Sequence, residues 1–226
     1  MPTNSLAGSI PVEVATWLPG LQVLNLNGNR LLGPIPSEFG ALQKVSVFQL
    51  GGQLRGLSGT VPTELGLLTK LTGTFDLSSN KLSLLIPTEL GHLTGVTGSN
   101  GFMLHHNSFT GIIPTELAQL KVTSDFQLHS NRFCGTIPAE ITAMSSSQVT
   151  AGWNIKPGNF FGPTPCEATS ALANLYSATG GSDMWYPPME RWMEGDPCEL
   201  FTSYGVARTA GWEGVECDQA TSPSQV

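Results

Sequence analysis

Asn29-Arg-Leu-Leu-Gly-Pro-Ile-Pro36 is the clearest copy of a phrase that recurs along this chain of 226 residues. The phrase closes on an Ile-Pro or Val-Pro step, and these steps recur every 24–27 residues, at Pro11, Pro36, Pro62, Pro87, Pro114 and Pro138. A period of this size predicts a solenoid, in which each repeat forms one turn of a coil and contacts only its neighbours. Because a solenoid offers a long surface in place of a deep pocket, the period favours binding over catalysis.

An alternating apolar pair precedes the phrase in most repeats. The clearest pairs are Leu24/Leu26, Phe75/Leu77, Phe102/Leu104 and Phe126/Leu128, and the third repeat, which departs from the pattern, has its predicted strand at Phe48-Gln-Leu50. This alternation has the period of two that is typical of a strand with one buried face. We expect one strand per turn, and stacking of the turns would then align these strands in a parallel sheet.

The Asn that opens the phrase, as in Asn29 or Asn107, is predicted to be an internal ladder residue. A side-chain amide buried where the coil turns a corner can pair backbone groups that would otherwise lack partners. Gln53 takes this place in the third repeat. A Gly four residues after the Asn permits a bend, and Leu84 is the exception at that position.

A short helical turn is predicted after each step, because an acidic residue recurs two positions beyond the Pro. In the fourth repeat this acid is Glu89, preceded by Thr88. We expect the hydroxyl to cap the turn and the negative charge to be favourable at its N-terminus. The same acid in every repeat indicates a structural role and not a row of catalytic carboxylates.

The full phrase N-x-L-x-G-x-I-P-x-E-L-G-x-L resembles the plant-type leucine-rich repeat over about residues 1–165. Proteins of this type include receptor-like kinase ectodomains, receptor-like proteins and polygalacturonase-inhibiting proteins. The resemblance implies an α/β fold: a curved solenoid of six to seven repeats with a parallel sheet on the concave face and short helical turns on the convex side.

Residues 166–226 resemble the N-terminal cap of such proteins, on the motifs Asp196-Pro-Cys198 and Gly211-Trp-Glu-Gly-Val-Glu-Cys-Asp218. The resemblance implies a disulfide between Cys198 and Cys217. Four residues fit one apolar helical face, namely Ala168, Leu172, Leu175 and Tyr176. A start-cap that follows the repeats is unusual. Either the chain is a piece of a longer protein with arrays in series, or the cap-like segment shields the last repeat.

The net charge of the chain comes entirely from residues 166–226. Residues 1–165 hold eight acidic and eight basic residues, whereas residues 166–226 hold nine and two, which accounts for the net charge of −7. With no basic patch, nothing favours nucleic acid as a partner. No apolar stretch is long enough to span a membrane.

Cysteine usage points to an oxidising compartment. Cys134 and Cys166 lie in consecutive repeats, where a disulfide and two buried thiols are equally compatible with the sequence. We expect an extracellular or cell-surface protein. Because Met1-Pro-Thr-Asn4 lacks the features of a signal peptide and the chain opens within a repeat, we expect the natural N-terminus to extend further.

We found no catalytic motif and expect no enzyme, no metal and no cofactor. His105 and His129 hold equivalent positions in neighbouring repeats and should lie side by side. A metal would need a third ligand, and Asp125 is predicted at the other edge of the strand. We therefore expect the histidine pair to contact a ligand or solvent.

The concave face is the predicted binding site, because alternation turns polar side chains outward there. The candidate ligand-binding residues are Asn25, Gln49, Asp76, Met103, His105, Gln127, His129 and Asn154. The predicted function is non-enzymatic recognition of protein, peptide or glycan in a receptor-like protein. The alternatives are an inhibitor of a cell-wall hydrolase and the ectodomain of a receptor kinase. The sequence does not specify an oligomeric state.

Overall fold

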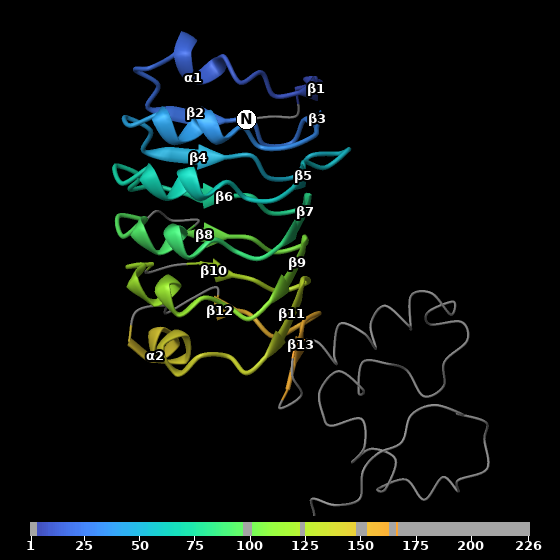
Figure 1. Ribbon diagram of the computed structural model, residues 1–226, viewed down its shortest axis with the longest axis vertical. Coiled ribbons are helices and arrows are strands. Elements are labelled where there is room, and N and C mark those ends of the chain that lie inside the picture. The colour runs from blue at the N-terminus through green and yellow to red at the C-terminus, as the bar shows by residue number, and fades with distance from the viewer. Residues whose placement is uncertain (1–3, 97–100, 123–124, 148–152, 163–165, 167–226) are drawn as a thin grey trace, which may run out of the picture.

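The computed structural model describes residues 4–96, 101–122, 125–147, 153–162 and 166. Within these residues the chain winds through successive turns that stack into a column, with the N-terminal turns at one end and α2 (Ala139–Ser147) at the other (Figure 1). Parallel strands and short helical turns alternate along it. The predicted α/β solenoid is therefore confirmed.

One face of the column is a parallel sheet of six strands among the described residues. Its strands, in spatial order, are β2 (Val23–Asn25), β4 (Val47–Gln49), β6 (Phe75–Asp76), β8 (Phe102–Met103), β10 (Phe126–Gln127) and β12 (Trp153–Asn154). The first members of the apolar pairs stand opposite one another in register, as in Phe75 with Phe102 and Phe102 with Phe126. The period-two alternation predicted this sheet correctly.

A second series of strands was not predicted. The segment after each ladder residue is also extended and pairs with its neighbours in parallel. In the described part of the chain β1 (Ala7–Ser9) pairs with β3 (Arg30–Leu32), and a five-stranded sheet contains β5 (Ser58–Gly59), β7 (Lys81–Leu84), β9 (Ser108–Gly111), β11 (Arg132–Gly135) and β13 (Phe160–Phe161). The expectation of one strand per turn was therefore wrong. The recurring Gly in these segments, such as Gly59 and Gly111, was assigned to a bend, whereas it ends a strand.

Helical turns lie on the side away from the six-stranded sheet. They are α1 (Val14–Trp17), η1 (Ser37–Ala41), η2 (Thr63–Leu67), η3 (Thr88–His92), η4 (Thr115–Gln119) and α2, where η marks a 3-10 helix. The predicted hydroxyl cap was wrong. Each 3-10 helix is preceded by the Pro in extended conformation, with no side-chain cap, and Thr88 instead lies 3.3 Å from the carboxylate of Glu89.

The core is a column of phenylalanine rings behind the six-stranded sheet. Phe48, Phe75, Phe102 and Phe126 are fully buried, with neighbouring ring centroids 5.3–5.7 Å apart and planes 14–17° from parallel. Offset stacking of this kind adds about 0.5–1.5 kcal/mol per pair to the burial of the rings. Each turn is thereby held at a fixed spacing from the next.

A ladder of side-chain amides fixes the corner of each turn. Asn131, which is buried, accepts a hydrogen bond from the N–H of Phe109 and donates to the carbonyls of Leu104 and Leu128. The same pattern holds at Gln53, Asn80, Asn107 and Asn159. Asn29 accepts from the N–H of Leu6 in the preceding turn and donates to the carbonyl of Leu26 in its own turn. The predicted ladder is confirmed, and Asn159 shows that it continues into the seventh turn.

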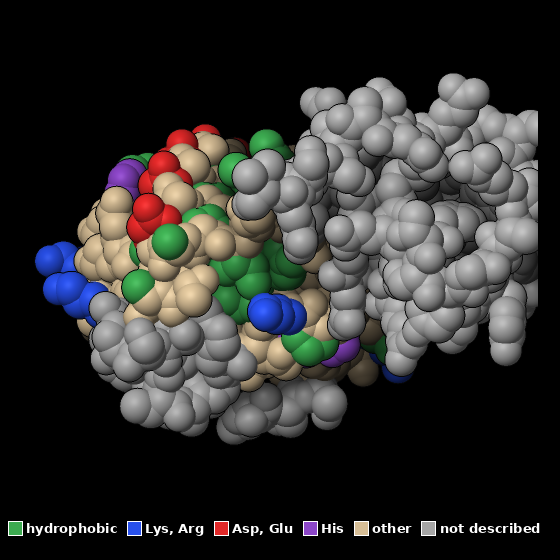
Figure 2. All heavy atoms as spheres, turned by 90° about the horizontal axis from the view of Figure 1, so that it is seen from below, with side chains coloured by type: hydrophobic (Ala, Val, Ile, Leu, Met, Phe, Trp, Pro, Cys, Tyr) green, Lys and Arg blue, Asp and Glu red, His purple; other side chains and the backbone are tan. Residues whose placement is uncertain are grey.

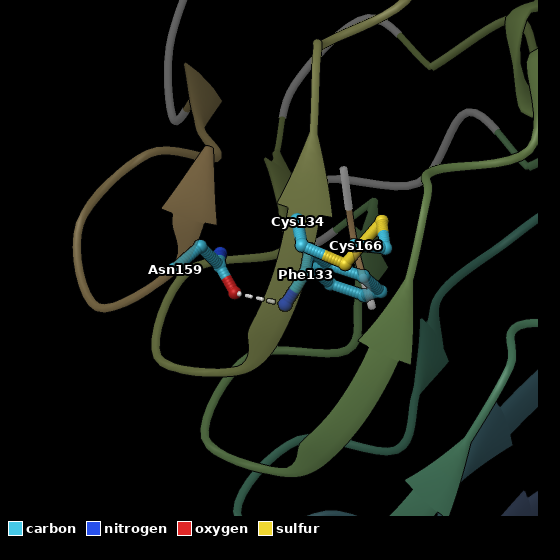
Figure 3. The surroundings of a disulfide bond; sticks show 4 residues. All are labelled: Phe133, Cys134, Asn159 and Cys166. Carbon is cyan, nitrogen blue, oxygen red and sulfur yellow. Dashed lines mark hydrogen bonds between the residues drawn. A yellow bond between two sulfur atoms is a disulfide. The ribbon is translucent and has the colours of Figure 1, made fainter. Parts of the chain in front are cut away.

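Cys134 and Cys166 form a disulfide, which resolves the alternative that the sequence left open (Figure 3). Cys134 belongs to β11, next to Phe133, whose N–H donates to Asn159 (Figure 3). The bond crosses the predicted boundary between residues 165 and 166. That boundary, the cap-like segment and the pairing of Cys198 with Cys217 remain predictions, because they fall on residues outside those described.

The C-terminal end of the described array carries hydrophobic side chains that reach the surface among polar ones (Figure 2). A shallow hollow there is lined by Ile137, Ile155 and Pro157 together with polar neighbours. Among the described residues, no helix has the length and apolar character needed to cross a bilayer.

Candidate ligand-binding face

The candidate residues form an ordered row on the outer surface of the six-stranded sheet, which we call the sheet face. Register pairs each member with the next in the neighbouring strand. The row runs Asn25, Gln49, Asp76, Met103, Gln127 and Asn154. With strands about 4.8 Å apart, its five intervals span about 24 Å.

Most of this row is accessible. Asn25 is exposed, and Gln49, Met103, Gln127 and Asn154 are partly exposed. Side-chain amides both donate and accept hydrogen bonds, so they can pair with either kind of polar group on a ligand. Met103 adds a flexible apolar contact at the centre of the row.

Asp76 differs from the expectation of a solvent-facing side chain. Only 4% of its surface is exposed, and its carboxylate accepts hydrogen bonds from Asn27 Nδ2 at 2.9 Å, the Ser78 N–H at 2.9 Å and Ser78 Oγ at 2.6 Å. The carboxylate reaches Asn27 across Gly51, where a β-carbon would lie 2.6 Å from either oxygen. Its acceptor sites are therefore occupied within the protein, and it organises the face instead of offering a free charge.

Three histidine rings gather beside the row. The rings of His105 and His129 stack with centroids 4.7 Å apart and planes 19° from parallel, as expected from their equivalent positions. His106 packs edge-on against both, at 5.3 and 5.0 Å. The Nδ1 atom of His129 lies 3.1 Å from Ser130 Oγ, whereas Nδ1 of His105 is buried without a hydrogen-bond partner.

The electrostatics of this histidine cluster favour neutral rings. Burial lowers the pKa of His105 below its usual 6.5, and His129 and His106 lower it further, while the carboxylates of Asp76 and Asp125 oppose the shift. The pKa of His129 is also lowered, first by burial and then by His106. An unpaired buried nitrogen is tolerated best without a proton, which agrees with a neutral His105.

His106 was not among the residues that the sequence predicted for the face. It adopts a left-handed backbone with φ +53°, at the position just before the ladder residue. Gly28 and Gly52 have φ +69° and +66° at the equivalent place in earlier turns. Histidine is among the residues that enter this region more readily than most, and the conformation brings its ring onto the neighbouring pair.

The described residues contain no group of three or more histidine, cysteine, aspartate or glutamate side chains arranged to hold a metal ion. The rings of the cluster lie face to face or edge to face instead of converging on a shared point. The arrangement suits hydrogen bonding and flat apolar contact with a ligand.

Comparison with known proteins agrees with this architecture. The family model described as Leucine Rich Repeat matches residues 20–42 and 74–93. The chain is a leucine-rich-repeat solenoid. A search of curated protein sequences found no significant match.

Several solved structures share the leucine-rich-repeat solenoid. The Arabidopsis receptor kinase HAESA, solved with the peptide hormone IDA and the co-receptor SERK1, is 33% identical over 70% of this chain and 25% of its own, with a TM-score of 0.57. The plant peptide hormone receptor RGFR1 in complex with RGF2 is 27% identical, and the match covers 71% of this chain and 28% of the receptor chain, with a TM-score of 0.59. A plant ice-binding protein is 27% identical, and the match covers 70% of this chain and 47% of the ice-binding protein, with a TM-score of 0.54.

The chain thus spans about a quarter of the length of the two receptor chains and about half of that of the ice-binding protein. The repeats are similar to those of plant receptor proteins, including HAESA in complex with a peptide hormone and the peptide hormone receptor RGFR1 in complex with RGF2.

Proposed function

We propose that this solenoid is a non-enzymatic recognition module that binds an extended peptide along the sheet face, as part of an extracellular or cell-surface receptor-like protein. The observation that carries the proposal is the in-register row from Asn25 to Asn154, which is accessible except at Asp76 and has the histidine cluster beside Met103 and Gln127. The peptide-hormone complexes of similar solenoids support the choice of ligand class.

The dimensions of the row suit such a ligand. An extended chain advances about 3.3 Å per residue, so a row of about 24 Å accommodates about seven residues. Amides at Gln49 and Gln127 can pair with peptide N–H and C=O groups on either side of Met103. The flat, neutral rings of His105 and His129 then offer a surface for an apolar or aromatic side chain.

The charge distribution limits the composition of the peptide. Residues 1–165 have no net charge, and the buried Asp76 is already paired with donors of the protein. The proposed ligand is therefore an uncharged or weakly charged peptide, held by hydrogen bonds and bridging water and not by a salt bridge.

The test is selection of binders from a displayed library of random twelve-residue peptides on the immobilised full chain. The selected peptides are then titrated by calorimetry against Gln127→Arg on the sheet face and Gln119→Arg on η4. We expect Gln127→Arg to weaken binding by about tenfold or more, since an added charge must be desolvated, and Gln119→Arg to leave it unchanged.

Equal effects of the two substitutions would refute the sheet face as the binding site. Recovery of no specific peptide, together with binding to an immobilised glycan array that Gln127→Arg abolishes, would keep the face and replace the ligand class.

A further inference from the structure

Three of the large aliphatic side chains exposed on the side of the solenoid that carries the second series of strands lie in two neighbouring turns. Leu84, Leu85 and Ile112 have 58%, 63% and 61% of their surface exposed. They stand at the ends of β7 and β9, just ahead of the Ile-Pro steps. We call these three residues the lateral patch.

Leu84 has a left-handed backbone conformation, which leucine rarely adopts. Its φ is +66°, and the equivalent positions in the other turns are glycines with φ between +70° and +94°. A left-handed conformation costs a residue other than glycine about 1–2 kcal/mol. A strained backbone that presents an exposed leucine indicates a role other than stabilising the solenoid itself.

The lateral patch is continuous with the disulfide. The side chain of Leu85 lies over Gly111, where a β-carbon would collide with it. A β-carbon on Gly135 would lie 3.2 Å from Ile112 Cγ2 and 3.5 Å from the sulfur of Cys166. An apolar strip therefore crosses three consecutive turns, from Leu85 through Ile112 to Cys166.

We propose that the lateral patch is the docking site of the segment 168–176 of this same chain, through its apolar positions. The disulfide fixes Cys166 at one end of the strip, and residues 167–226 continue from there. The sequence places Ala168, Leu172, Leu175 and Tyr176 on one helical face.

The lengths of the two partners agree. As a helix, residues 168–176 would span about 12 Å at 1.5 Å per residue. Leu85 lies two turns from the turn that holds the disulfide, which is about 10 Å at the strand spacing of about 4.8 Å. A helix that starts beside Cys166 thus brings Leu175 and Tyr176 to Leu85.

Three apolar side chains in the last described turns, Ile141, Met144 and Ile155, are at most 2% exposed, so they are covered more completely than the lateral patch. The charge of the segments also favours apolar contact, because residues 1–165 are neutral overall and offer no field for the acidic segment. Docking on the lateral patch would cover the three large hydrophobic side chains that are exposed among the described residues after Leu67.

The test is photocrosslinking of the full chain with p-benzoylphenylalanine in place of Leu85, followed by reduction, digestion and mass spectrometry. We expect an intramolecular crosslink, at the mass of one chain, to Leu175, Tyr176 or their immediate neighbours. The control places the same group at Leu67, which is 55% exposed on η2, and should give no crosslink to this segment.

The substitution Leu175→Asp should abolish the crosslink from position 85 while the circular dichroism of the array stays unchanged. Crosslinks at twice the chain mass would assign the lateral patch to a second copy and overturn the proposal. A crosslink to another segment, an unchanged yield in Leu175→Asp, or no crosslink at all would overturn it as well.

Discussion

Replacement of Asn131 by Ala tests whether the amide ladder holds the turns together. The side chain accepts from Phe109 N–H at 3.1 Å and donates to Leu104 O at 3.1 Å and Leu128 O at 3.0 Å. Alanine removes these hydrogen bonds, each contributing about 1 kcal/mol, and leaves a buried N–H unpaired at a further cost of about 1–3 kcal/mol. We expect the free energy of unfolding to fall by about 4 kcal/mol.

Urea titration followed by circular dichroism at 25 °C measures this loss, and amide hydrogen exchange at Phe109 locates it. The matched control is Asn25→Ala, since Asn25 is exposed and its oxygen accepts only from the nearby Asn27 N–H; it should change stability by less than about 0.5 kcal/mol. A third variant, Asn131→Asp, keeps an oxygen that can accept from the Phe109 N–H. Its second carboxylate oxygen, however, would face the carbonyl oxygens of Leu104 and Leu128, and oxygen atoms repel one another there. This variant should therefore lower the free energy of unfolding at least as much as Asn131→Ala. A loss below about 1 kcal/mol in Asn131→Ala, or equal losses in the two alanine variants, would refute the ladder as the main support of the corner.

Three further outcomes are expected. In the Leu175→Asp background, where the lateral patch is left uncovered, Leu84→Gly should raise the free energy of unfolding by about 0.5–1 kcal/mol, because it relieves a left-handed leucine at a modest entropic cost, and a lower urea midpoint would contradict this. The pKa values of His105 and His129 are lowered in the folded protein, so both bind protons less readily when folded, and the free energy of unfolding should fall as the pH drops below about 6.5. The double variant His105→Gln/His129→Gln should lose less stability over this pH range. An equal loss in the parent and the double variant would exclude the two histidines as its source. Cys134→Ser should cost about 3–4 kcal/mol, since the disulfide closes a loop with a sequence separation of 32, and a thermal melt no lower than that of the parent would show that the bond does not constrain the unfolded chain.

The solenoid and its interior were predictable from the sequence because the residues that determine them recur in most turns. An apolar pair with period two, an amide and a Gly recur in most turns, and each has a fixed geometric consequence, as Phe102 and Asn107 show in the structure. The stacking of His105 on His129 followed from the same register.

Features that depend on a side chain reaching across more than one turn, or on a left-handed backbone, were not predictable. Alternation placed Asp76 outward, but only the structure shows Asn27 reaching it from two turns away across Gly51. His106 joined the histidine cluster through a left-handed backbone that the sequence signals by Gly28, Gly52 and Gly158 at equivalent positions.

The second sheet was missed for a related reason. The Gly that ends several of its strands, such as Gly59 in β5, was assigned to a bend, so the extended residues before it were not recognised as a strand. The exception at Leu84 was visible in the sequence, but its strain and exposure became evident only from the backbone.

The most direct test of peptide recognition on the sheet face is the imidazole nitrogen–proton NMR spectrum of the full chain during titration with a selected peptide. The chain has four histidines, of which three form the cluster and His92 lies exposed on η3. We predict that the signals of His105, His106 and His129 shift with a single binding constant while that of His92 stays in place. A shift of His92, or saturation without any change in the cluster, would contradict the account.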